Sequence, residues 1–167
     1  MALLNILQFP DPRLKNKAEP VSQFDITLAQ HVDNMLETMY EAQGVGLAAI
    51  QVNLAQHILV MDVSSSDQQP RHFINLNIVG KEGLTQSQEG CLSFPGVYAT
   101  VERAKTVQVE YQDIEGKSHQ LEASGLLAIC LQHELDHLNG ITFYDHLSPL
   151  KQSLLRKKMA KYRKRAL

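Results

Sequence analysis

The sequence predicts an α+β fold, with antiparallel or mixed β-sheets around one central helix and a further helix at the C-terminus. Segments with strand-like composition do not alternate regularly with helical segments, which argues against a parallel α/β fold. One apolar helical segment, residues 124–139, carries two histidines four residues apart. The C-terminal residues 151–167 follow a helix-start signal and hold eight bases and no acid.

The size and composition are those of one folded domain. The chain has 167 residues, of which 44% are apolar and 20% charged, and this balance excludes a disordered protein. A membrane span is excluded because no apolar run reaches roughly 18 residues. The N-terminus lacks a basic leader and a cleavage site, so we expect no signal peptide. Two cysteines make no disulfide framework, and we expect a cytoplasmic protein.

The chain begins with an extended segment and a helix. Residues 1–24 contain three prolines and no sustained period, so we expect them to wrap over the surface. Asp25 is expected to cap a helix that runs to about Gln43 and is ended by Gly44 and Gly46. The apolar positions of this helix share one face: Leu28, Val32, Met35, Leu36 and Met39.

Strands are predicted where short runs are rich in β-formers or alternate between apolar and polar residues. The last two runs flank Glu115-Gly116 and should form a hairpin. The predicted strands are 57–63, 72–80, 104–113 and 117–123.

Two helices are predicted in the last third of the chain. The first runs from about Ser124 to Asn139 and is closed by Gly140 at its C-terminal end. The second begins at Ser148-Pro149, with serine as the cap and proline in the first turn.

The first of these two helices contains the pattern H-E-x-x-H. His133 and His137 are four residues apart, so both imidazoles face one side of a helix and suit one divalent ion. Glu134 stands beside the first histidine, where it can take a proton from a metal-activated water. The motif lies in an apolar stretch, and buried ionisable groups without a task are costly. The central helix is therefore predicted to bind a metal.

A catalytic metal site needs a third protein ligand and an open position. The metzincin pattern requires a histidine where this chain has Phe143, and the thermolysin-like pattern requires a later glutamate, yet none follows Glu134. Cys130 lies on the same helix, but three consecutive turns of a straight helix cannot converge on one ion. We expect it to be a small buried residue. Cys91 comes from a separate segment and can complete the set as a thiolate; its alternative is a buried structural thiol.

Two segments outside the helix add candidate functional residues. Gly44 and Gly46 lie in GVGLAAIQ, which lacks the lysine and hydroxyl residue of a phosphate-binding loop. We expect these small residues to let the backbone lie against a substrate. Gln51 ends the segment and offers an amide that can donate to an oxyanion. The second segment is residues 89–93, which contains Cys91. Glu89 begins this segment and is expected to orient a ligand or pair with a base such as Arg103.

The segments GVGLAAIQ (44–51), EGCLS (89–93) and QHELDH (132–137) together resemble the three signature motifs of peptide deformylases in order, spacing and type. The likeness spans nearly the whole chain. It implies a metal-dependent hydrolase that removes the formyl group from the N-terminal formylmethionine of nascent polypeptides and releases formate. It also implies Fe²⁺ as the cofactor, with Zn²⁺, Ni²⁺ or Co²⁺ able to substitute.

The resemblance implies a role for each matching position. The implied metal ligands are Cys91, His133 and His137. Glu134 is similar to the general acid and base, while Gln51 and the backbone N–H of Leu92 are similar to the oxyanion donors. The implied substrate-binding residues, which include a pocket for the methionine side chain, are Gly44, Val45, Gly46, Glu89, Leu126, Ile129 and Cys130.

Three positions depart from the family pattern. Leu76 stands where a proline is frequent, Gln43 where many bacterial members have an acid that can pair with Arg103, and Tyr98 where an arginine is common. The last two lie near the expected peptide groove and bear on substrate affinity. The alternative interpretations are a zincin-like metallopeptidase, a non-catalytic metal-binding paralogue and an RNA-binding protein with a vestigial site.

Charge is unevenly distributed along the chain. Residues 151–167 carry +8, and the other 150 residues hold 8 bases and 18 acids, or −10. We therefore expect a catalytic part, residues 1–147, and an appended basic helix, residues 148–167, that docks on an anionic surface. This helix should be anchored by Leu150, Leu154 and Met159. The resemblance implies the ribosome near its exit tunnel as the partner, with no DNA or membrane. The expected phosphate contacts are Lys157, Lys158, Lys161, Lys164 and Arg165.

Overall fold

The computed structural model describes residues 2–166, which form α-helices and a five-stranded antiparallel sheet. The α+β prediction is confirmed. The strands lie side by side in chain order: β1 (Gly46–Ala48), β2 (Ile58–Met61), β3 (Arg71–Cys91), β4 (Phe94–Gln112) and β5 (Ser118–Ser124). The helices are α1 (Ile26–Glu41), α2 (Gly125–Leu138) and α3 (Pro149–Ala166), with 3-10 turns η1 (Pro12–Lys15), η2 (Ala49–Val52) and η3 (Phe143–His146). In this described part, every helix falls short of the length or the apolar character that crossing a membrane requires.

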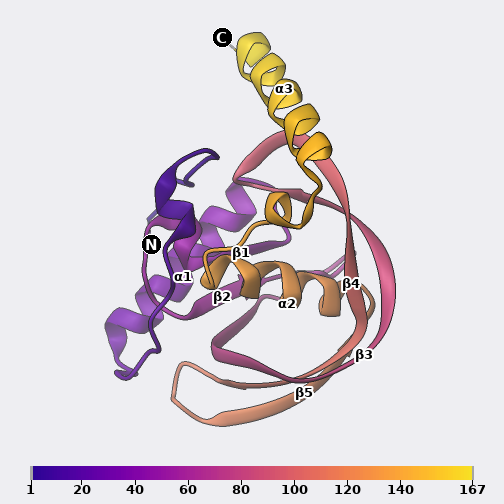
Figure 1. Cartoon of the computed structure of the whole chain (residues 1–167). Helices are drawn as coiled ribbons and strands as arrows, with labels where there is room; N and C mark the ends of the chain where they lie inside the picture. The colour runs from indigo at the N-terminus through magenta and orange to yellow at the C-terminus, as the bar shows by residue number, and fades with distance from the viewer. Residues whose placement is uncertain (1, 167) are drawn as a thin grey trace.

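Strands β3 and β4 form a long ribbon that curves around α2 (Figure 1). The register shifts three times along this pair, and irregularities of this kind bend a strand and increase its twist. One shift lies between Glu89 and Cys91, so the ladder is disturbed where the candidate metal-binding cysteine stands. The predicted strand 72–80 covers only the first half of β3. The second half, residues 81–91, is mostly exposed and polar, so its sequence lacks the pattern that predicts a strand.

Helix α1 starts where the sequence predicts and ends differently. The Asp25 side chain accepts a hydrogen bond from the Leu28 backbone N–H at 3.1 Å. The predicted end at about Gln43 is close to the observed one, but the left-handed residue that ends the helix is Gln43 itself, with a φ of 58°, and not a glycine. The N–H of Gln43 donates to the Tyr40 carbonyl, and that of Gly44 donates to Met39, which closes a Schellman motif. Gly44 thus takes part in the ending through its N–H, whereas Gly46 begins β1.

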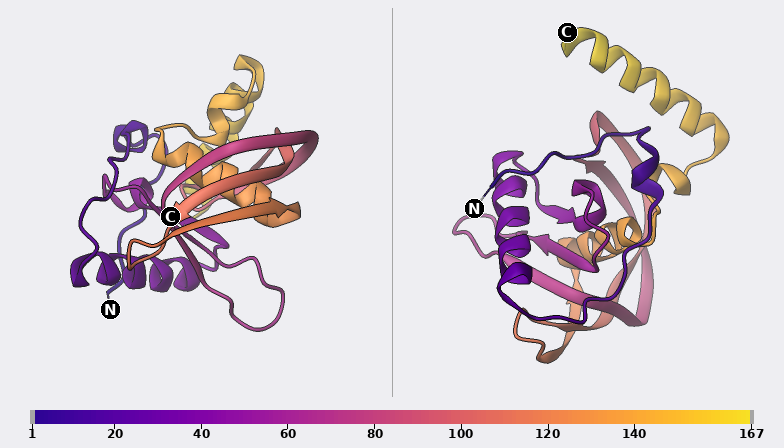
Figure 2. Two further views of the ribbon diagram at one scale, coloured as in Figure 1. Left: turned by 90° about the horizontal axis from the view of Figure 1, so that it is seen from below. Right: turned by 90° about the vertical axis from the view of Figure 1, so that its left-hand side faces the viewer.

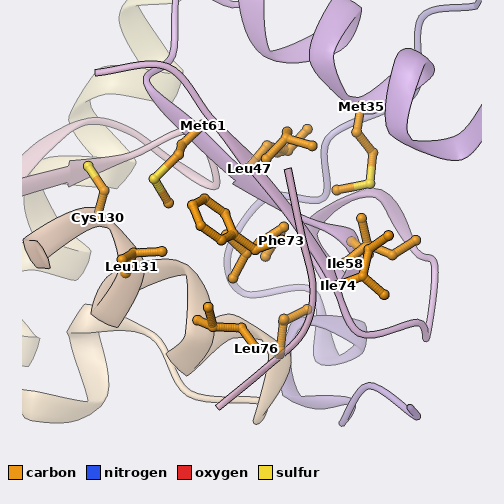
Figure 3. Packing of buried hydrophobic residues seen from close by; sticks show 14 of the residues in the cluster. Met35, Leu47, Ile58, Met61, Phe73, Ile74, Leu76, Cys130 and Leu131 are labelled. Atoms are coloured by element: carbon orange, nitrogen blue, oxygen red, sulfur yellow. The ribbon is translucent and has the colours of Figure 1, made fainter. Parts of the chain in front are cut away.

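The main core lies between α1, the sheet and α2 (Figure 3). Met35 of α1, Phe73 of β3 and Leu131 of α2 meet there and are almost fully buried. Cys130 belongs to the same cluster, in agreement with the prediction of a small buried residue. This core fixes the position of α2, and therefore of the two histidines it carries.

The N-terminal segment crosses the surface of the body (Figure 2), as its prolines predict. It is attached at two points close to the candidate site. The Leu7 N–H donates to the Gln51 carbonyl at 2.7 Å, and the Phe9 N–H donates to the Ser93 carbonyl at 2.9 Å. Both hydrogen bonds hold backbone next to predicted functional residues.

Helix α3 begins at the predicted proline and extends outward from the body (Figure 2). It rests on a second core, which also contains Phe94, Val97, Val101, Phe143 and Leu147. Leu155 and Met159 enter this core, with 4% and 2% of their surface exposed. The predicted anchoring by Leu150 and Leu154 is wrong, because they are 71% and 49% exposed. The side of α3 that contacts the second core includes position 155, which lies about 100° around the helix axis from position 154.

Candidate metal centre

Helix α2 and the end of β3 bring Cys91, His133 and His137 together. One ligand atom from each residue lies within 4.8 Å of the other two. The Sγ atom of Cys91 is 3.2 Å from Nε2 of His137. His137 is fully buried and His133 nearly so, whereas Cys91 is half-buried. The cluster therefore sits at the inner end of a recess.

These residues fit a divalent transition metal. Bonds of about 2.0–2.3 Å to nitrogen and sulfur place the ligand atoms of a tetrahedral ion about 3.5 Å apart. The ligand atoms lie within 4.8 Å of one another, and Cys91 Sγ lies 3.2 Å from His137 Nε2, which is compatible with this spacing. One thiolate with two imidazoles is a donor set that soft or borderline divalent ions accept. Three protein ligands leave a fourth position for water or substrate.

Glu89 holds the first histidine in orientation. His133 Nδ1–H donates to Oε1 of Glu89 at 2.8 Å, which leaves Nε2 for a metal. Arg103 donates to both oxygens of Glu89, each at 2.8 Å, and also to Asp136 at 2.7 Å. Burial alone would raise the pKa of Glu89, but its hydrogen bonds to Arg103 and His133 lower it to about 2. Glu89 thus contacts both His133 and Arg103, as expected, but it is not among the described residues that line the cavity, so its substrate-binding role stays a prediction.

Glu134 lies beside the cluster, with one carboxylate oxygen that has no hydrogen-bond partner among residues 2–166. Its side chain is buried, and this oxygen is Oε1. Burial raises the pKa of Glu134 to about 7, which suits a group that accepts and returns a proton near neutral pH. A Cβ atom at Gly46 would lie 2.6 Å from Oε2 of Glu134. Glycine therefore serves close approach to Glu134 here, a role separate from the ending of α1.

Gln51 has its amide fixed by the surrounding backbone. Its Oε1 accepts from the Ala48 N–H at 2.9 Å, so Nε2 must face the other way. Nε2 donates to the Ser93 hydroxyl at 3.1 Å and points at the Cys91 sulfur at 3.5 Å. The residue is 1% exposed. An amide donor is thus aimed at the metal-binding recess.

A cavity of about 610 Å³ opens onto this cluster. It brings together the segment that follows α1 and residues of β1, η2, β3, β4, α2 and α3. Predicted site residues in its lining are Gly44, Val45, Gly46, Gln51, Cys91, Leu92, His133 and Glu134. The sequence reasoning gave no role in the substrate site to the segment 94–97 or to Tyr162, which also line it. The tyrosine could have been selected only by knowing where α3 packs.

The other predicted pocket residues lie elsewhere on α2. Leu126 is 53% exposed, and Cys130 is packed in the main core. Neither of these residues, nor Ile129, is part of the cavity lining. Burial raises the pKa of the Cys130 thiol to about 12, which disfavours the reactive thiolate form. Their contact with a methionine side chain stays a prediction.

The three departures from the family pattern are also placed. Gln43 and Tyr98 line the cavity, whereas Arg103 is paired with Glu89 and Asp136. Tyr98 is 66% exposed at the rim. Leu76 is buried in the main core. The departures therefore affect the groove and the core, and leave the metal ligands intact.

Comparison with known proteins agrees with the geometry. The family model of polypeptide deformylases matches residues 3–153. The chain is 54% identical over 164 residues to the peptide deformylase of Chromobacterium violaceum, covering 98% of both chains. It is 52% identical to that of Neisseria meningitidis over the full length of both. A peptide deformylase crystal structure from Legionella pneumophila superposes with a TM-score of 0.93 at 44% identity, covering 98% of this chain and 96% of that one.

The alternative interpretations, which were a metallopeptidase, a non-catalytic paralogue and an RNA-binding protein, are therefore replaced by the deformylase interpretation. The match covers most of the chain, and the ligand cluster is assembled in three dimensions. The chain belongs to the polypeptide deformylase family, and it is a hydrolase that removes the N-terminal formyl group from its substrates.

Proposed function

We propose that Glu134, Gln51 and Leu92 carry out deformylation around an ion held by Cys91, His133 and His137. The observation that carries this proposal is a buried carboxylate oxygen of Glu134, next to the ligand residue His133, that makes no hydrogen bond within the described part of the chain. When bound, the ion supplies an activated water and polarises the formyl carbonyl.

The proton path runs through one carboxylate. Glu134 accepts the proton of the attacking water and then delivers it to the leaving amine nitrogen, so that formate and a free N-terminus result. Gln51 Nε2–H and the backbone N–H of Leu92 donate to the oxygen of the tetrahedral intermediate. Removing one such donor typically costs about 10²–10³ in rate.

The size of the acyl group is set by close packing. Gly46 stands against Glu134, and Gly44 would meet the Leu92 side chain at 2.7 Å if it carried a Cβ. The formyl group carries only hydrogen on its carbonyl carbon, and this position offers little room for a larger substituent. Val45, which lines the cavity beside these glycines, is placed to contact the methionine side chain, with Leu126, Ile129 and Cys130 as the predicted further contacts.

We propose Fe²⁺ as the native ion, with Zn²⁺, Ni²⁺ or Co²⁺ able to substitute. The ligand set accepts all of these, and the family resemblance favours iron. The test is anaerobic purification with metal analysis and measurement of formate release from a formyl-Met peptide, followed by exposure to air. We expect iron and a loss of activity in air as the ion or the thiolate is oxidised. A preparation that contains zinc and is equally fast and stable in air would refute iron.

We also propose that the enzyme acts in the cytoplasm on nascent chains at the ribosome, through the basic part of α3. Its five predicted contact residues are all exposed, on a helix that extends from the body. The Lys157→Glu/Lys161→Glu variant should lose co-sedimentation with ribosomes at moderate salt. Binding to phosphates weakens steeply when lysines are removed and when salt is added. The matched control reverses two exposed lysines of the sheet, Lys81 and Lys105. Equal sedimentation of both variants would contradict docking through α3.

A further inference from the structure

Helix α3 and Cys91 of the metal site pack against the same hydrophobic core. Leu155 and Met159 pack in the second core with Phe94 and Val97, and Cys91 packs against the same cluster. Phe94 follows the metal-binding cysteine by three residues. The helix is therefore seated on the turn that carries the ligand, next to the cavity.

Tyr162 continues the side of α3 that contacts the second core. It follows Met159 by three residues, so both side chains face the same side of the helix. Its ring lies against Gly96 of β4 so closely that a Cβ atom on this glycine would overlap with the ring. Gly96 also has a φ of 79°. A larger residue at position 96 is thus disfavoured both by its backbone conformation and by the tyrosine.

The ring of Tyr162 stands in the wall of the cavity that opens onto the metal centre. The same lining contains His133 and Glu134 at its inner end and Tyr98 at its rim. Tyr98 and Tyr162 are 66% and 44% exposed, so both offer surface to a bound molecule. Position 162 lies outside the stretch that the family model matches, residues 3–153.

The geometry of the substrate indicates which of its residues lie next to Tyr98 and Tyr162. A formyl group at the metal centre puts the methionine residue deepest, and each following residue of an extended chain adds about 3.3–3.6 Å. The cavity volume of about 610 Å³ lies within the range of roughly 300–1,000 Å³ that holds drug-sized ligands, so it holds more than the first residue. The second and third residues therefore pass the rim.

We propose that Tyr162 determines specificity for the residues that follow formylmethionine, by offering its ring to apolar side chains at the second or third position. The inference rests on the proposed placement of the formyl group at the metal centre. It makes α3 part of the peptide-binding groove as well as the proposed docking element. It also replaces the simple division into a catalytic part, 1–147, and an appended helix.

The test compares two peptides of equal length, formyl-Met-Leu-Leu and formyl-Met-Gly-Gly, with metal-loaded enzyme. A leucine side chain that buries about a third to a half of its surface on the ring gains about three- to tenfold in affinity. Tyr162→Ala should therefore raise KM for the leucine peptide about three- to tenfold with kcat retained, and change KM for the glycine peptide by less than about twofold. Tyr162→Phe should keep the wild-type values, because the ring provides the contact.

A matched pair of truncations separates the ring from the fold of the helix. A chain ending at Lys161 keeps the buried Leu155 and Met159 but lacks the tyrosine, whereas a chain ending at Arg163 keeps it. The first should behave as Tyr162→Ala does and the second as wild type. Equal changes on both peptides, or no change on either, would overturn the specificity role. Failure of the wild-type enzyme to release formate from either peptide would instead overturn the placement on which the inference rests.

Discussion

The pair formed by Glu89 and Arg103 offers the sharpest test of how the centre is held. Glu89→Gln keeps the size of the side chain and removes its charge. The side chains of Arg103 and Glu89 are 4% and 5% exposed, so the substitution leaves a buried guanidinium with only Asp136 as a charged partner. The imidazole of His133 loses its charged acceptor at the same time.

The magnitude follows from burial. Removing one member of a buried ion pair costs about 3–5 kcal/mol. The lower end applies because Asp136 remains 2.7 Å from Arg103 and because glutamine can still accept a hydrogen bond. About 3 kcal/mol corresponds to a fall in Tm of about 6–12 °C for a domain of this size. The metal affinity should fall about 10- to 100-fold, as is typical when the partner of a metal-binding histidine is lost.

The assay separates stability from metal binding. Thermal unfolding of the metal-free proteins measures the ion pair, and competition with a chelator measures the metal affinity. In the double variant Glu89→Gln/Arg103→Met no buried positive charge is left unpaired, so most of the stability should return. Its metal affinity should stay low, because His133 still lacks a carboxylate. An unchanged Tm and an unchanged metal affinity in Glu89→Gln would refute this account.

Three further predictions concern the site and the helix. Glu134→Gln should retain one metal per chain yet lose at least about 10²-fold in formate release; near-normal turnover would remove Glu134 from the mechanism. Cys91→Ala should abolish tight metal binding while Cys130→Ala keeps it, because one helix cannot supply all three ligands, and metal analysis of both proteins decides between the two thiols. Met159→Ala should destabilise the protein by about 2–5 kcal/mol, whereas Leu154→Ala should stay within about 0.5 kcal/mol of wild type; denaturant titration giving equal values would contradict the observed seating of α3.

Part of the site was predictable because His133, Glu134 and His137 are close in sequence. The spacing of His133 and His137 places both on one face of any helix, and the apolar residues around them predict that this face is buried. The cap at Asp25 and the buried face of α1 are equally local. Cys91 could be preferred over Cys130 by the geometry of a single helix.

The rest depended on contacts between distant segments. The second half of β3, residues 81–91, is mostly exposed and has no alternating apolar pattern. It forms a strand because its backbone pairs with β4. The choice of Leu155 over Leu154 as an anchor depends on which side of α3 meets the second core. The apolar residues of α3 alone leave several stripes possible.

The sequence by itself determined the α+β class and the central helix with two histidines four residues apart, since these follow from local periodicity and short spacings, whereas the roles predicted for Gln51 and Leu92 came from the resemblance of three motifs to a family. Only the tertiary structure decided that Glu89 joins His133 to Arg103, that Gly46 serves close approach to Glu134, and that Tyr162 reaches the cavity. Each of these contacts joins residues between 14 and 88 positions apart along the chain. Such contacts arise when packing brings separate elements together, and local sequence patterns do not encode which elements will meet.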